Sequence, residues 1–129
     1  ENIRIADAFK PNSLSQKELG IIDNVVNAYK EIMAVGCTGC NYCMPCPNNV
    51  NIPMIFSLYN DVVMFRDEMP VIMYNTMVPT DQNATNCIEC GECEDKCPQH
   101  LEIINNLKDA HRALYNEEWK QGTKGQPKK

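Results

Sequence analysis

CTGCNYCMPCP at residues 37–47 and CIECGECEDKCP at residues 87–98 together hold all eight cysteines of this 129-residue chain. Their spacings are C-x2-C-x2-C-x2-C-P and C-x2-C-x2-C-x3-C-P. Disulfides require particular Cα separations and directions, which a cysteine at every third residue does not provide. Dense runs of this kind are typical of metal sites in a reducing compartment. The spacing therefore predicts metal ligation and a cytoplasmic protein.

A [4Fe-4S] cluster suits this spacing because one tight loop can wrap three corners of a cube while backbone N–H groups point at its sulfurs. The second run has the spacing of bacterial two-cluster ferredoxins, in which the fourth cysteine ligates the other cluster. Gly39 and Gly91 are expected to take loop conformations that other residues avoid. Pro47 and Pro98 fix the backbone after each fourth cysteine and turn the chain outward. Two clusters with exchanged fourth ligands are therefore predicted.

The predicted ligands of the first cluster are Cys37, Cys40, Cys43 and Cys97, and those of the second are Cys87, Cys90, Cys93 and Cys46. The first run is one residue shorter than usual between its third and fourth cysteines. His100 and His111 are expected in surface or capping roles, because the cysteines already complete both ligand sets. Tyr42 is expected either to shield a cluster from water or to take part in ordinary packing.

Two zinc sites, each held by four cysteines, are the alternative metal assignment. Such sites usually join two C-x2-C pairs across a longer stretch of chain, whereas four cysteines are contiguous here. Contiguous runs that each end in proline favour clusters over zinc. The sequence contains no Ser/His/Asp set, phosphate loop or dinucleotide fingerprint, so no catalytic residue is predicted.

The formal net charge is −5, and four lysines lie in the last ten residues, KQGTKGQPKK. The body of the chain is therefore strongly acidic, which argues against nucleic acid as a partner. An acidic surface permits docking to a basic redox partner, or is simply a solvated surface. No apolar stretch is long enough for a transmembrane helix, so no membrane partner is predicted.

Helical periodicity dominates the rest of the sequence. A capping box between Ser15 and Glu18 predicts a helix that ends at Gly36. Three further helices are predicted over about residues 52–69, 70–77 and 101–118, and Pro53 suits the first turn of the first of them. Residues 80–86 are expected to form a polar loop. Because no strand-like alternation separates the two runs, the predicted fold class is mostly α.

The chain also contains an internal near-repeat. The first three cysteines of the two runs correspond at an offset of 50 residues, and the fourth cysteines correspond at an offset of 51. At the larger offset Ile52 corresponds to Ile103 and Phe56 to Leu107. Two pseudo-symmetric halves, each a cysteine loop followed by a helix, are therefore expected. The predicted organisation is a linker from a missing N-terminal domain at 1–14, a dicluster domain at 15–118 and a flexible basic tail at 119–129.

CTGCNYCMPCPNNVNIPMIFSLYN at residues 37–60, followed by CIECGECEDKCPQHLEI, closely resembles the ferredoxin-like C-terminal domain of a bacterial group of aldo/keto reductases. The resemblance covers about residues 11–115 and includes the lead-in PNSLSQKELGII and the short ending of the first run. It implies an α-helical ferredoxin fold and a parent oxidoreductase in which a catalytic (β/α)8 barrel precedes this module. The catalytic tetrad and nicotinamide site of that barrel correspond to no residue of this chain.

The resulting hypothesis is a module that binds two [4Fe-4S] clusters and relays electrons. Its expected partners are the N-terminal catalytic barrel of the parent chain and a redox donor or acceptor. The alternative is a non-redox interaction module, stabilised by zinc or by clusters that are never cycled, which docks a catalytic domain. Catalysis by this chain alone is not expected.

Overall fold

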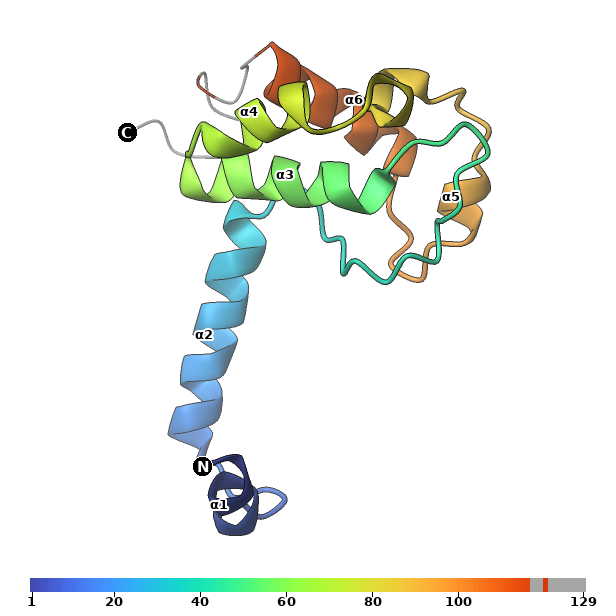
Figure 1. Cartoon of the computed structure of the whole chain (residues 1–129). Helices are drawn as coiled ribbons and strands as arrows, with labels where there is room; N and C mark the ends of the chain where they lie inside the picture. Colours follow the sequence, from blue (N-terminus) through green and yellow to red (C-terminus); the bar gives the residue numbers. More distant parts are fainter. Residues whose placement is uncertain (117–119, 121–129) are drawn as a thin grey trace. The chain divides into compact units, whose positions relative to one another are not determined.

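The computed structural model describes residues 1–116 and residue 120, and these contain helices but no strand (Figure 1). The mostly α fold class predicted from the sequence is therefore confirmed. The chain forms two compact units, Glu1–Glu31 and Ile32–Lys129. Within the described part of the chain, no helix is both long enough and apolar enough to cross a bilayer.

The first unit contains α1 (Asn2–Ala8) and nearly all of α2 (Gln16–Ile32). The predicted capping box starts α2: the Ser15 N–H donates to Glu18 Oε2 at 2.8 Å, and the Glu18 N–H donates to Ser15 Oγ at 3.4 Å. Such a reciprocal pair satisfies donors that the first helical turn leaves free. Neither helix has a buried residue.

The helix α1 lies within residues 1–14, the stretch predicted to be a linker. Residues 2–8 lack a clear apolar period, but they include one arginine and two alanines, which favour helix intrinsically. The helix ends at Ala8, and the next residue, Phe9, donates its N–H to the Ile5 carbonyl at 3.1 Å while its own backbone is extended. Pro11 lies three residues beyond this end.

Three helices form the core of the second unit: α3 (Ile52–Phe65), α4 (Met69–Thr76) and α6 (Ile103–Tyr115), each in contact with the other two (Figure 1). Pro53 lies in the first turn of α3 as predicted, and the Asn51 side chain accepts the Met54 N–H at 3.4 Å. The largest fully buried side chains come mainly from α3 and α6 and include Phe56, Ile55, Ile103, Leu107 and Leu114. Burying a side chain of this size contributes about 1.5–3 kcal/mol.

Several boundaries differ from the predictions. α3 ends at Phe65 rather than near residue 69, because Arg66 takes the left-handed conformation (φ 55°) and its N–H donates to the Val62 carbonyl. The expected polar loop contains two 3-10 turns, η1 (Thr80–Gln82) and η2 (Ala84–Asn86). A short helix, α5 (Glu92–Asp95), lies unpredicted within the second cysteine run. The predicted end of the last helix and, apart from residue 120, the predicted basic tail lie outside the described residues.

The near-repeat of the sequence recurs in the backbone. Left-handed φ values pair Gly39 (66°) with Glu89 (57°) and Asn41 (64°) with Gly91 (82°), each at the offset of 50 residues. At the offset of 51, Asn49 (61°) pairs with His100 (51°). The unusual conformations expected of the two glycines are therefore confirmed, and each glycine corresponds to a non-glycine residue with the same sign of φ.

Backbone hydrogen bonds follow the same repeat. Met44 N–H to Asn41 C=O and Glu94 N–H to Gly91 C=O both measure 2.9 Å. Asn49 N–H to Cys46 C=O and His100 N–H to Cys97 C=O both measure 3.0 Å. The two halves therefore share these turns, and the turn after each fourth cysteine leads into α3 or α6.

Candidate metal centre

The first of two cysteine-lined cavities takes its cysteines from both runs. Cys37, Cys40, Cys43 and Cys97 lie in its wall. The cavity holds about 340 Å³ of empty space, counting the part open to solvent. Apolar side chains of α3 and α6, including Phe56 and Ile103, form much of the remaining wall, and its lining contains no ionisable side chain except the cysteines.

The second cavity has the complementary set of cysteines. Cys87, Cys90, Cys93 and Cys46 line it, with about 320 Å³ of empty space including its open part. Val50, Ile104 and Leu107 contribute apolar wall. Ile52 lines both cavities and is only 1% exposed. The two cavities are therefore neighbours that share one buried side chain.

The turns after the fourth cysteines explain how each run reaches the other cavity. The turn closed by Asn49 N–H and Cys46 C=O leads to Val50, and both Cys46 and Val50 line the second cavity. The corresponding turn after Cys97 leads to Leu101, and both of these residues line the first cavity. Because Pro47 and Pro98 fix φ within these turns, the chain leaves each run in a defined direction.

The eight cysteines are all free, and they differ in exposure. Cys93 and Cys97 are buried, whereas Cys40 and Cys90 are exposed. The Gly39 N–H donates to Cys37 Sγ at 3.4 Å, an example of the backbone-to-sulfur bonds expected in a ligand loop. Each cavity thus combines a buried interior with one cysteine that reaches the surface.

Burial makes ionisation of the cysteine thiols unfavourable. It raises the pKa of Cys93 to about 11, and the nearby charges of Glu94 and Cys87 act in the same direction. Burial also raises the pKa of Cys43, assisted by Cys37, Cys40 and Cys97, which are the other three cysteines of its cavity. Thiolate is the form that binds metal, so loading these sites must displace protons.

The positions of the sulfurs are relevant to the choice between zinc and clusters. The sulfurs of a tetrahedral zinc site lie about 3.8 Å apart, because each is about 2.3 Å from one ion. Among the described residues, no three His, Cys, Asp or Glu side chains could hold a single metal ion. A cubane instead presents a separate iron to each thiolate, so the cysteines need only line a shared cavity.

The other candidate residues have different surroundings from those expected. Tyr42 is 66% exposed and lines neither cavity, so ordinary packing does not describe it, and its shielding of a cluster stays a prediction. His100 is exposed, as expected. His111 instead makes a 2.9 Å hydrogen bond through Nδ1 to the Tyr74 hydroxyl, between α6 and α4. The sequence pattern gave no signal for this contact between residues 37 positions apart.

Three acids of the second run have specific partners. Lys108 Nζ lies 2.7 Å from Glu89, and Lys96 Nζ lies 3.4 Å from Glu92. The Glu94 carboxylate accepts the Ile104 N–H at 2.8 Å, in the first turn of α6. A carboxylate there satisfies a free backbone donor and interacts favourably with the helix dipole. This third bond ties the second run directly to α6.

Two neighbouring cavities, each with four thiols in a largely apolar wall on a helical frame, fit an iron–sulfur protein. A family model for the 4Fe-4S dicluster domain matches residues 36–102, more than half of the chain, and the chain belongs to this family. Searches of curated proteins and of solved structures found no significant match. The prediction of 4Fe-4S cluster binding is confirmed at the level of the family, and this family indicates iron–sulfur electron transfer.

Proposed function

We propose that this chain binds two [4Fe-4S] clusters and relays electrons as the ferredoxin-like module of a larger aldo/keto reductase-type oxidoreductase. The observation that carries the proposal is the composition of the two cavities. Each is lined by three cysteines of one run and the fourth cysteine of the other. Four thiols per cavity match the ligand requirement of one cubane, and the exchange matches the two-cluster ferredoxin pattern.

Bound clusters would supply reversible one-electron chemistry, and the residues of this chain would control access to it. The apolar side chains around each cavity exclude water. Ile52 keeps the two sites adjacent but separate. Cys40 and Cys90 are the exposed thiols, so the loops around them are the parts of each site that a donor or acceptor could approach most closely. Solvent exposure and hydrogen bonds to sulfur are among the factors that set cluster potentials.

The parent enzyme is the part of the proposal that rests on resemblance. The stretch at residues 37–60 resembles the module that follows an aldo/keto reductase barrel. The proposed partners are accordingly that barrel in the same chain and a redox donor or acceptor in the cytoplasm. The sequence of the parent chain before residue 1 tests this directly. A barrel with a Tyr, Lys, Asp and His set supports the proposal, and any other catalytic domain contradicts it.

Anaerobic metal analysis tests the clusters themselves. The loaded chain is expected to contain about eight irons and about eight acid-labile sulfides, as two cubanes require. A colourless protein that binds zinc stoichiometrically and lacks sulfide would instead support a structural zinc module. Clusters that are present but cannot be reduced or oxidised at accessible potentials would support a structural role for iron.

A pair of double variants tests the exchanged ligands. Cys43→Ser/Cys97→Ser removes two cysteines from one cavity, so about half of the iron should remain. Cys43→Ser/Cys46→Ser removes the same number of thiols but one from each cavity, so both clusters should be impaired. Ligation of each cluster by a single run predicts the reverse order of iron retention. Iron and sulfide analysis, together with EPR of the reduced samples, distinguishes the two assignments.

A further inference from the structure

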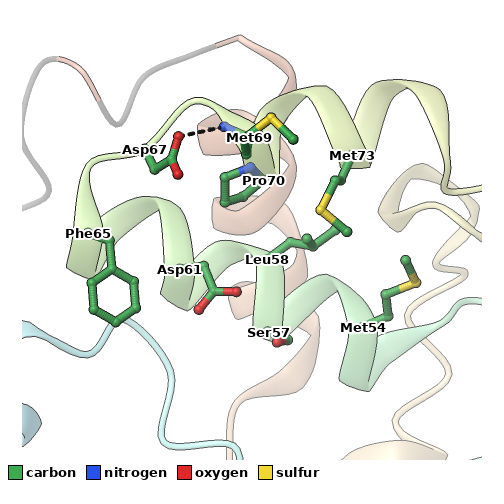
Figure 2. Close-up of a pocket in the computed structure, with 9 residues that line it drawn as sticks. All are labelled: Met54, Ser57, Leu58, Asp61, Phe65, Asp67, Met69, Pro70 and Met73. Atoms are coloured by element: carbon green, nitrogen blue, oxygen red, sulfur yellow. Dashed lines mark hydrogen bonds between the residues drawn. The ribbon is translucent and has the colours of Figure 1, made fainter.

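A third cavity, separate from the cysteine-lined pair, is an open groove formed by α3, α4 and the turn between them, with about 930 Å³ of empty space including its open part (Figure 2). None of the residues that line this groove lines either cysteine cavity. Cluster binding therefore gives this groove no role.

The groove exposes apolar side chains, several of which are flexible methionines. Met54, Met69 and Met73 line it, which accounts for three of the seven methionines of the chain. Met69 is 55% exposed, and Phe65 in the same lining is 65% exposed. Methionine is unbranched and polarisable, so a methionine-lined groove can adjust to an inserted apolar chain. Covering these side chains would also remove apolar surface from water.

Two carboxylates make the groove acidic. Asp61 and Asp67 lie toward the same end as Phe65, whereas Met54 and Met73 lie toward the other end (Figure 2). Asp67 accepts the Met69 N–H at 3.0 Å. Within the described part of the chain, neither carboxylate forms an ion pair with Lys, Arg or His.

Some other acids of the second unit do have cationic partners. Glu68, next to Asp67 in the sequence, lies 3.0 Å from Lys120 Nζ. Glu89 and Glu92 pair with lysines as described above. Within residues 1–116 and residue 120, the groove thus combines exposed apolar side chains with two carboxylates that form no ion pair. Its complement is a chain segment that carries both a cation and apolar side chains.

We propose that this groove binds a peptide segment of a partner protein in which apolar side chains flank a lysine or arginine. The apolar side chains lie against Met54, Met69 and Met73, and the cation lies between Asp61 and Asp67. An amphipathic segment laid into a hydrophobic groove is a recurrent mode of peptide recognition. The negative charge of the chain also attracts a basic segment before contact.

Selection from a phage-displayed library of random 14-residue peptides against the cluster-loaded chain tests this site. Recovered peptides should carry Lys or Arg between Leu, Ile, Phe or Met. Their affinity, measured by fluorescence anisotropy, should fall about tenfold in Asp61→Asn/Asp67→Asn, since each exposed ion pair contributes up to about 1 kcal/mol. Added salt should weaken binding to the unaltered chain more than to this variant.

Two further variants provide the controls. Met69→Lys places a cation on an exposed apolar position of the groove and should abolish binding. Asp109→Asn removes the same charge as each groove substitution, but on α6 and outside the groove, and should leave the affinity within about twofold. Visible absorption of each variant reports its clusters separately, so a failure of cluster binding is distinguishable from a failure of the groove.

Three results would overturn the proposal. The first is that no recovered peptide depends on Asp61, Asp67 and Met69. The second is that recovered groove binders lack a basic residue. The third is concentration-dependent dimerisation in sedimentation velocity that Met69→Lys abolishes, which would assign the groove to a second copy of the chain.

Discussion

The side-chain amide of Asn60 makes two hydrogen bonds with the backbone of Val35, 25 residues earlier in the chain. It accepts the Val35 N–H at 2.9 Å and donates to the Val35 carbonyl at 2.8 Å. Val35 is buried, and its carbonyl also accepts the Cys37 N–H at 2.8 Å. One side chain of α3 thus satisfies both backbone groups of a buried residue and ties α3 to the first ligand loop.

Asn60→Ala should therefore destabilise the loaded chain by about 1–3 kcal/mol, the cost of leaving buried backbone groups without partners. The first cluster should also be lost before the second when a chelator is added. Urea unfolding and EPR during chelation measure these effects. Asn105→Ala is the matched control, because Asn105 is exposed on α6 and makes one 3.3 Å side-chain bond with Glu102. Equal effects of the two substitutions would contradict the role assigned to Asn60.

Ile52→Ala should affect both clusters at once, because this side chain lines both cavities and is almost fully buried. Removing it should lower stability by about 2–5 kcal/mol and admit water between the sites. Thermal unfolding and the EPR spectrum of the reduced protein provide the measurements. Ile88→Ala, an exposed position that lines only the second cavity, should cost less than about 0.5 kcal/mol. A spectral change confined to one cluster in Ile52→Ala would be inconsistent with its shared position.

Glu94→Gln should raise the reduction potential of the second cluster while changing stability little. Glutamine can still accept the Ile104 N–H, but it removes a negative charge next to Cys93. The reduced cluster, which carries the extra electron, is repelled less. An EPR-monitored redox titration measures the change. Glu92→Gln is the control and should shift the potential less, because Lys96 partly neutralises that exposed charge.

Removal of the same Glu94 bond should show in stability. Glu94→Ala deletes both the charge and the acceptor at the start of α6, so it should lower the free energy of unfolding by about 1 kcal/mol. Urea unfolding of the Gln and Ala variants separates the hydrogen bond from the charge. Equal stability of these two variants would mean that the bond to Ile104 contributes nothing measurable.

His111 should make stability fall in mild acid. The Tyr74 hydroxyl accepts the Ala84 N–H at 3.2 Å and also lies 2.9 Å from His111 Nδ1, where the histidine tautomer sets which of the two groups donates. Burial lowers the pKa of His111 below its usual value. As pH falls, the unfolded histidine binds a proton first. The stability that His111 contributes by staying neutral in the folded state is therefore complete above about pH 6.5, and it is lost as pH falls toward the folded pKa.

Urea unfolding at about pH 7.5 and about pH 5.5 measures this dependence. His111→Asn should lose less stability between the two pH values than the unaltered chain, whereas His100→Asn, at an exposed position, should behave like the unaltered chain. An unchanged pH dependence in His111→Asn would exclude this histidine as the source.

Local features of the structure were accessible from the sequence. The Ser15 and Glu18 capping box and the proline in the first turn of α3 act over a few residues, and both were predicted correctly. The left-handed φ of Glu89 escaped prediction, although the near-repeat aligns this residue with Gly39. Comparing the two halves position by position would have revealed it. The helix α5 was not predicted because a four-residue helix is too short to show a hydrophobic period.

The sequence by itself determined the ligand inventory, the mostly helical frame and the turns around the cysteines. These follow from covalent spacing and from hydrogen bonds between residues a few positions apart. The grouping of the thiols into two exchanged sets was also predicted from the sequence, and the same sets line the two cavities. Only the tertiary structure decided that Ile52 lies at both cavities and that Asn60 holds Val35. The packing of α3, α4 and α6 brings these residues together from distant positions. No local pattern encodes such packing, because it depends on how the apolar faces of all three helices fit at once.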